Sequence, residues 1–244
     1  MARIDDLVSE ALKLLPEKPA DDAKQEAKKR YSELVSQKVA LALAAELRHR
    51  GLKEARPAGE GELGDSGAER RMAGGLGAKK VDVTWATEES GLLFAISVKT
   101  VNFRDKTTGN FQKNLINRRG DMLMEAVTLH RRFPYAVLAA LFFLDKDAEN
   151  DATTKRRSTF VNAHARLQLF NGRNDPAGRE EQFERFFLIL LDASPSLVRL
   201  RPFAVGNPDR EVSMSDIFDD LLRIVAQRNP DFYEFVSGNL VKAS

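Results

Sequence analysis

The sequence predicts a mixed domain of the α/β or α+β class, in which helices flank one central mixed β-sheet. Helical and strand periodicities alternate along the chain, in the order helix, strands, helix, strand and a mixed C-terminal part. The 244 residues, of which 43% are hydrophobic, are enough to bury a sizeable core. These observations exclude a disordered or fibrous chain, and we expect one domain over residues 1–244.

The first third of the chain predicts two helices and a loop. Residues 3–15 form a short amphipathic pattern, and in residues 21–50 apolar side chains recur at three- and four-residue steps until Gly51 stops the helix. Residues 51–78 hold 8 of the 15 glycines and almost no large apolar side chains. This segment is therefore expected to be a loop with, at most, a short strand at residues 70–73.

A β-hairpin is expected next. Val81, Val83 and Trp85 alternate with polar residues, and residues 92–100 form a β-rich run after a turn at residues 88–91.

The remaining elements follow from periodicity and length. Residues 111–132 carry the apolar stripe of a helix, and residues 135–144 form the continuous apolar run of a fully buried strand. Farther on, the pattern predicts helices at 158–170, 215–225 and 232–240 and strands at 183–191 and 197–205.

Composition limits the chemistry. The absence of cysteine excludes disulfides, thiolate metal sites and thiol nucleophiles. The net charge is only +2, but residues 99–179 hold 15 Lys and Arg against 8 Asp and Glu, so this segment carries +7 and the rest −5. A local basic surface can bind a polyanion even in a nearly neutral protein, although solvated helix faces would give the same count.

Targeting signals are not evident. The first 15 residues contain charges throughout, and the longest apolar run, residues 135–144, is too short to span a bilayer. The sequence predicts a cytoplasmic protein with no membrane partner.

Polar side chains lie where the predicted hairpin should be apolar. The two-residue period places Leu93, Ser97 and Lys99 on one face. A turn at residues 88–91 pairs residue i with residue 179 − i, which puts Asp82 across from Ser97 and diagonal to Lys99. A carboxylate and an ammonium so placed suit metal-assisted phosphodiester hydrolysis. A structural Asp–Lys ion pair on a sheet would give the same pattern.

These residues resemble the PD-(D/E)xK superfamily of restriction-endonuclease-like nucleases. The resemblance rests on residues 79–83, Lys-Lys-Val-Asp-Val, and residues 95–100, Ala-Ile-Ser-Val-Lys-Thr. Asp82 corresponds to the metal-binding aspartate and Lys99 to the lysine of the motif. Together with the order helix, hairpin, helix, strand, the resemblance covers residues 24–145, the expected catalytic core.

The resemblance implies a restriction-endonuclease-like fold and a Mg²⁺-dependent endonuclease that hydrolyses DNA, with Mn²⁺ able to substitute. It suggests a type II restriction or phage-defence enzyme. Residues 146–244 would then serve recognition or dimerisation, and a homodimer is expected because cutting both strands usually takes two sites. The alternative is a nucleic-acid-binding module of the same fold that has lost the reaction, which Ser97 in place of an acid favours.

Two residues depart from the motif. Val81 replaces its proline, and Ser97 replaces its acidic ligand. A minority of the superfamily's restriction enzymes also have Ser-x-Lys and take the missing carboxylate from the following helix. That helix offers Asp121 and Glu125 here, and Glu125 lies nearer the apolar stripe. The resemblance therefore implies that Glu125 is the second metal-binding acid, whereas an ordinary exposed glutamate is the alternative.

The superfamily often adds a glutamate from the helix before the hairpin. Glu33, Glu46 and Gln37 compete for this position, and helical angles favour Glu46 because they place Glu33 on the solvent side. Glu69, just before a glycine cluster, is a further candidate.

Basic side chains surround the predicted site in sequence and are expected to bind phosphates of the nucleic acid. They are Lys79, Lys80, Arg104, Lys113, Arg118 and Arg119. Arg119 and His130 fall in the apolar stripe of their helix, where a charge needs a partner, and His130 is expected to be a hydrogen-bonded core residue. The glycine-rich residues 74–77 lack the spacing of a P-loop and indicate only close approach to a backbone.

Overall fold

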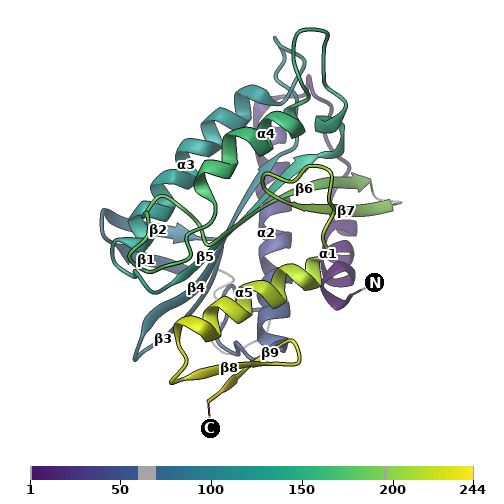
Figure 1. Cartoon of the computed structure of the whole chain (residues 1–244). Helices are drawn as coiled ribbons and strands as arrows, with labels where there is room; N and C mark the ends of the chain where they lie inside the picture. Colours follow the sequence, from purple (N-terminus) through teal and green to yellow (C-terminus); the bar gives the residue numbers. More distant parts are fainter. Residues whose placement is uncertain (1, 60–69, 195–196, 244) are drawn as a thin grey trace.

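A five-stranded mixed sheet forms the centre of the computed structural model, which describes residues 2–59, 70–194 and 197–243 (Figure 1). In spatial order its strands are β3 (Val83–Thr87), β4 (Gly91–Val101), β5 (Val137–Asp145), β6 (Arg185–Ser194) and β7 (Leu197–Ala204). The three central strands run parallel and both edge strands pair antiparallel. The predicted mixed class with one central mixed sheet is confirmed.

Helices cover both faces of this sheet. On one face lie α1 (Arg3–Lys13), α2 (Gln25–His49) and α5 (Met214–Arg228), and on the other α3 (Gln112–His130) and α4 (Thr159–Leu167). Short 3-10 turns follow β5 and α4, at η1 (Lys146–Glu149) and η2 (Gln168–Phe170). Figure 1 shows α3 and α4 together at the upper left, with α2 on the far side of the strands.

The side chains of the buried strands contribute to two separate hydrophobic cores, one on each face of the sheet. Successive side chains of a strand point to opposite faces, so Leu141 and Phe143 of β5 pack with α1, α2 and α5, whereas Phe142 and Leu144 pack with α3 and α4. This explains the uninterrupted apolar run, which is typical of a strand covered on both faces. The strand begins at Val137, two residues later than predicted, and Tyr135 is exposed.

The predicted hairpin is interrupted at Asp82. The segment before it, β2 (Gly77–Val81), pairs with β1 (Arg70–Gly74) in a separate two-stranded sheet, and β3 begins only at Val83. A bulge between Trp85 and Ala86 then shifts the register opposite the start of β4. Because of this shift Leu93 packs on the α2 side of the sheet, so the prediction that it shares a face with Ser97 was wrong.

The predicted last helix, residues 232–240, was also wrong. The chain there forms a hairpin of β8 (Tyr233–Val236) and β9 (Asn239–Lys242). Its two-residue turn consists of Ser237 and Gly238, which both have positive φ, as a tight hairpin turn requires. Burial alternates along β8 with the period of a strand.

None of the helices in the described ranges is both long and apolar enough to cross a membrane.

The β1–β2 hairpin packs against α3 through Gly74 and Gly75. This is the close approach to a backbone that the glycine-rich residues 74–77 predict. The Gly75 N–H donates to the Thr128 carbonyl (2.8 Å), and a Cβ on Gly74 would lie 2.3 Å from Thr128 Cγ2 and 2.7 Å from Thr128 O. A side chain at Gly74 therefore has no room unless the hairpin moves.

Gly74→Ala is accordingly expected to release the hairpin from α3. Trypsin should then cut after Lys79 and Lys80 several times faster than in the wild type, while the unfolding free energy changes by only about 1 kcal/mol because the hairpin is peripheral. Gly120→Ala is the control, since a Cβ added at Gly120 would have no atom within 4 Å other than those of the adjacent helix backbone. Digestion of Gly74→Ala at the wild-type rate would show that the hairpin is not held by this contact.

Candidate active site

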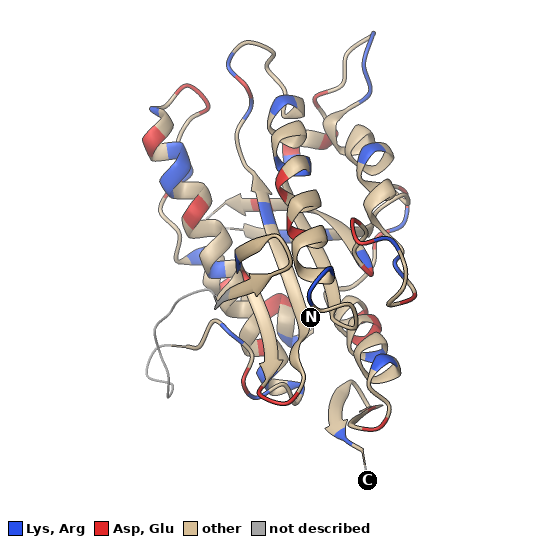
Figure 2. Ribbon diagram, turned by 90° about the vertical axis from the view of Figure 1, so that its left-hand side faces the viewer, with Lys and Arg blue, Asp and Glu red and all other residues tan. Residues whose placement is uncertain are grey.

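A groove with a volume of about 1280 Å³ opens between α2 and α3, with β2 and β4 between them. Figure 2 looks toward this side of the molecule, with α2 at the left and α3 in the centre as two upright helices. The groove lining includes nine Lys or Arg side chains but only five Asp or Glu side chains. Three of the predicted site residues, Asp82, Lys99 and Glu125, lie together in it.

The three side chains converge although they come from different elements. Lys99 Nζ lies 3.3 Å from Asp82 Oδ2 and 3.1 Å from Glu125 Oε2. Asp82 follows β2, Lys99 is on β4 and Glu125 is on α3. Both carboxylates therefore contact the same ammonium, as predicted for Asp82 from the hairpin spacing and for Glu125 from the resemblance together with its helical position.

Strand pairing and one backbone hydrogen bond position Asp82. The pairing of residue i with residue 179 − i is confirmed at Val83, which lies opposite Ile96. Asp82, one residue earlier, is held by the Val98 N–H, which donates to its Oδ2 (2.7 Å). The interruption between β2 and β3 thus leaves a carboxylate at the edge of the sheet, fixed against the neighbouring strand.

Glu125 is almost completely buried, with 2% of its surface exposed. Burial raises the pKa of its carboxyl group, the Lys99 ammonium lowers it, and the Asp82 charge raises it again, with a net raised pKa. Neither its second oxygen, Oε1, nor the buried Ser97 hydroxyl makes a hydrogen bond of ordinary length and angle with the described residues, but the hydroxyl is close enough to this carboxylate to help lower its pKa. A buried carboxylate oxygen is costly unless its hydrogen-bonding capacity is used, and Oε1 of Glu125 has capacity for a further interaction.

Lys99 remains charged in this setting. Burial on its own lowers the pKa of the Lys99 ammonium, but the carboxylates of Glu125 and Asp82 outweigh it and hold the pKa above its usual value.

The two carboxylates fit a hard divalent cation. Mg²⁺ is usually bound by one or two carboxylates, with waters and substrate phosphates completing its octahedron, and Glu125 Oε1, which accepts no hydrogen bond of ordinary geometry, is an oxygen atom of the right kind. No group of three or more His, Cys, Asp or Glu that could hold a metal occurs in the described part of the chain. A cation at this point would therefore need oxygen atoms from substrate or water.

Most of the predicted phosphate-binding residues line the groove. These are Lys79, Lys80, Arg104, Lys113 and Arg118. Arg119 does not line it, and the side chain is exposed. The sheet covers Leu115 and Met122 of α3 and leaves the flank that carries Arg119 open to solvent, so the prediction that Arg119 lies within the apolar stripe was wrong.

The prediction that Glu46 joins the site from the helix before the hairpin was wrong. Glu46 is buried at the far end of α2, where it accepts hydrogen bonds from Arg50 Nε (2.7 Å) and Arg3 Nη1 (2.5 Å), and it does not line the groove. Glu33 and Gln37 line it instead. The other candidate, Glu69, lies outside the described residues.

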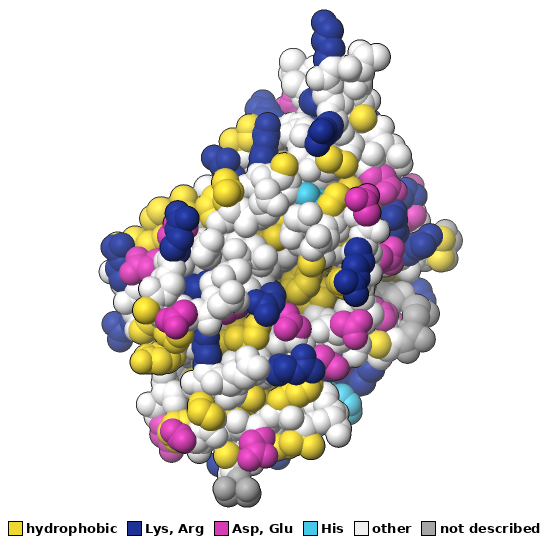
Figure 3. All heavy atoms as spheres, viewed as in Figure 1, with side chains coloured by type: hydrophobic (Ala, Val, Ile, Leu, Met, Phe, Trp, Pro, Cys, Tyr) yellow, Lys and Arg dark blue, Asp and Glu magenta, His cyan; other side chains and the backbone are white. Residues whose placement is uncertain are grey.

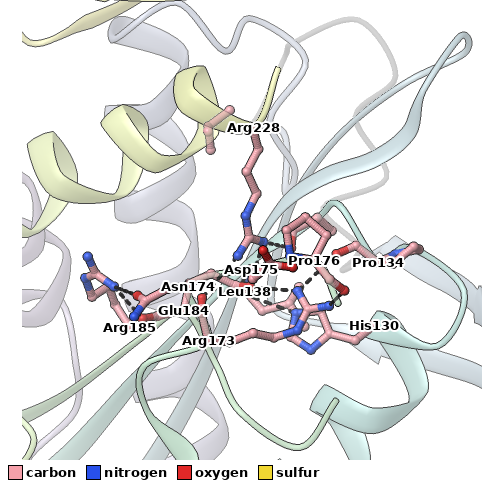
Figure 4. Close-up of polar contacts among 12 residues, drawn as sticks. His130, Pro134, Leu138, Arg173, Asn174, Asp175, Pro176, Glu184, Arg185 and Arg228 are labelled. Carbon is pink, nitrogen blue, oxygen red and sulfur yellow. Dashed lines mark hydrogen bonds and ion pairs between the residues drawn. The ribbon is translucent and has the colours of Figure 1, made fainter. Parts of the chain in front are cut away.

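His130 is a core residue, as predicted. Its Nε2 lies 3.3 Å from Glu184 Oε2, and its Nδ1 lies 3.0 Å from the Glu180 carbonyl oxygen (Figure 4). Glu184, which no sequence pattern indicates, is the centre of this buried polar cluster.

Three polar residues of the groove that sequence patterns did not indicate are Lys28, Ser32 and Ser36, all on α2. Their signal is weak, because they recur at four-residue steps on a helix face that looks ordinarily solvated.

No protein-family model matches the chain, and neither the curated proteins nor the solved structures include a significant match to it.

Proposed function

We propose that the protein is a Mg²⁺-dependent endonuclease that hydrolyses phosphodiester bonds of DNA, of the type II restriction or phage-defence kind that its motif resembles. The observation that carries this proposal is the convergence of Asp82, Lys99 and Glu125 in one groove, within 3.3 Å of a common point, the Lys99 amine. Asp82 lies 17 positions and Glu125 lies 26 positions from Lys99 in the sequence, and they reach it from separate elements.

The groove also has the charge that a polyanion requires. Lys and Arg outnumber Asp and Glu in its lining by nine to five. On the face shown in Figure 3, by contrast, positive and negative side chains are interspersed. Cations gathered in a concave surface bind backbone phosphates and position a nucleic acid without reading its sequence.

Each residue has a separate role in this proposal. Asp82 and Glu125 would hold the cation, and the Val98 N–H keeps the Asp82 carboxylate in place. Bound Mg²⁺ would polarise the phosphate and lower the pKa of a bound water. Lys99 orients both carboxylates and presents a permanent positive charge where negative charge develops on the phosphoryl oxygens.

The test is cleavage of supercoiled plasmid in Mg²⁺, Mn²⁺ or EDTA, followed by agarose gel electrophoresis. We expect nicked or linear product with either metal and none in EDTA. Asp82→Ala and Lys99→Ala should each reduce the rate at least about 100-fold, the usual loss when one group that stabilises the transition state is removed. Circular dichroism shows whether both variants are folded.

The alternative is an inactive nucleic-acid-binding module, and the same samples distinguish it. Salt-sensitive plasmid binding without cleavage by the wild-type protein in either metal would favour the binding module. Neither binding nor cleavage would mean that Asp82, Lys99 and Glu125 form a structural ion-pair cluster.

A further inference from the structure

Lys28 is a buried cation without an acidic partner. Only 7% of its surface is exposed, yet it lines the groove. Its amine donates to the Asp21 carbonyl (2.9 Å) and lies 5.7 Å from the centre of the Phe103 ring. No carboxylate among the described residues lies within ion-pair distance of it, and two of the three donors of a lysine amine are left over.

A second lysine at the same ring shows the contrast. Lys18 also lies over Phe103, at 5.4 Å, but its amine is paired with Asp145 Oδ2 (2.5 Å). Lys28 is the more buried of the two, and burying a charge without a counter-ion is unfavourable. A counter-ion supplied by a ligand in the groove would remove this cost.

The position of Lys28 relative to Lys99 follows from the way α2 lies along β4. Ser36 Oγ is 3.5 Å from Thr100 Oγ1, and Asn102 Nδ2 donates to Ser32 Oγ (3.1 Å). Helix α2 therefore runs antiparallel to β4. Its polar residues Ser36, Ser32 and Lys28 lie at increasing distance from Lys99 along this direction.

Distance along the helix gives the spacing between Lys28 and the reacting point. Ser36 contacts the neighbour of Lys99, and Lys28 lies eight residues before Ser36, which is about 12 Å at the helical rise per residue. Phosphates of one strand of B-DNA follow one another at about 3.4 Å of helix axis. Lys28 is therefore out of reach of the reacting phosphate but within a few nucleotides of it.

We propose that Lys28 binds a backbone phosphate of the substrate, two to four nucleotides from the phosphate that is cleaved, and that the hydroxyls of Ser32 and Ser36 lie along the path between them. The inference rests on the proposed function, because it requires a nucleic acid in the groove. It adds the direction in which the strand leaves the site, along α2 toward the N-terminal end of that helix.

The test compares Lys28→Met with Lys24→Met. Methionine keeps an apolar stem over Phe103 and removes only the charge. Lys24 lies four residues earlier, is exposed and does not line the groove. Lys24→Met therefore has the same net charge as Lys28→Met but leaves the groove unchanged. Binding of a fluorescein-labelled 20-base-pair duplex is measured in EDTA, which prevents cleavage, by fluorescence anisotropy between about 50 and 200 mM salt.

Loss of one phosphate contact has a defined signature. For Lys28→Met we expect the slope of log K against log salt to fall in magnitude by about 1, and the affinity at 0.1 M salt to drop roughly 5- to 10-fold. Lys24→Met should keep the wild-type slope. The melting temperature of Lys28→Met should equal or exceed that of the wild type, because an unpaired buried charge has been removed.

Two results overturn the inference, and they differ. If the wild-type protein binds and cleaves DNA but Lys28→Met has the same slope and a lower melting temperature, Lys28 is a structural residue and the proposed function stands. If the wild-type protein does not bind the duplex at all, the proposed function fails and the inference fails with it.

Discussion

Glu125→Gln is expected to reduce plasmid cleavage at least about 100-fold and to leave the protein folded. Glutamine has the same shape, but it removes the negative charge that the proposed cation needs and one of the two carboxylates that orient Lys99. Lys99 keeps its contact with Asp82 at 3.3 Å, so the buried ammonium is not left without a counter-ion. The measurements are initial cleavage rates in Mg²⁺ and the midpoint of urea unfolding.

Asp121→Asn is the matched control for this variant. Asp121 lies one turn before Glu125 on α3 and lines the same groove, but it is exposed and pairs with Arg118. It should therefore cleave within a few-fold of the wild-type rate. Full activity of Glu125→Gln would disprove the assignment of Glu125 as the second acid and would leave Asp82 as the sole carboxylate ligand.

The pH dependence of cleavage offers a second check on Glu125. The carboxyl group must be ionised to hold a cation, and burial raises its pKa above the usual 4.5. Activity of the wild-type enzyme should therefore fall as pH decreases, beginning above the range in which an exposed glutamate titrates.

Strand periodicity predicted that Asp82 and Lys99 lie together at the centre of the site, whereas Glu125 was predicted from the resemblance to the nuclease motif together with its helical angle. The predicted turn at residues 88–91 is one residue too long, because Thr87 pairs with Gly91. The bulge between Trp85 and Ala86 nevertheless restores the predicted pairing at Val83, and that pairing brings Asp82 beside Lys99. The helical angle of Glu125 beside the apolar stripe of α3 brings its carboxylate to the sheet. For residues of the same element, a period of 2 or 3.6 gives the face on which each side chain lies.

Contacts between elements that are distant in sequence were not predicted. The angle of Glu46 relative to the apolar face of α2 predicts its burial correctly. It does not predict that the carboxylate contacts Arg3 and Arg50 and lies away from the groove. Lys28 likewise looks like an ordinary helix lysine until Phe103 is placed beneath it. The segment before Asp82 pairs with β1, so the short strand expected at residues 70–73 is confirmed, but its pairing with residues 77–81 was not predicted.

Glu184 is the clearest case of a residue without a sequence signal, and Glu184→Ala is expected to lower the free energy of unfolding by about 3–5 kcal/mol. Its carboxylate is fully buried and accepts hydrogen bonds from Arg173 Nη1 (3.0 Å), Arg228 Nη1 (2.6 Å) and the Leu138 N–H (2.6 Å), beside His130 Nε2 (Figure 4). Alanine would leave two buried guanidinium groups without their shared counter-ion. Urea unfolding followed by circular dichroism measures the loss.

The pKa of the Glu184 carboxyl gives a second test of its stabilising role, one that needs only the isosteric variant Glu184→Gln. Burial alone raises the pKa of the Glu184 carboxyl, but the hydrogen bond and charge of His130 and the charge of Arg228 outweigh it and hold the pKa below 4.5. A carboxyl with a lowered folded-state pKa stabilises the protein above its unfolded pKa, and this contribution is lost as pH falls through the folded value. Glu184→Gln should therefore be less stable than the wild type at pH 7, and the difference should shrink below pH 4.5.

Glu180→Ala is the control for Glu184→Ala, because it removes a glutamate from the same segment without disturbing the buried cluster. The Glu180 side chain is 40% exposed and pairs with Arg131 at the surface, so its removal should cost less than about 1 kcal/mol. Equal unfolding midpoints for the alanine variants of Glu184 and Glu180 would show that the buried cluster does not stabilise the fold. A large difference would show that one carboxylate ties α3, β5 and α5 together through His130, Leu138 and Arg228. The groove wall formed by α3 is then held in place by Glu184, which lies just before β6 and far in the sequence from the Asp82–Lys99 motif.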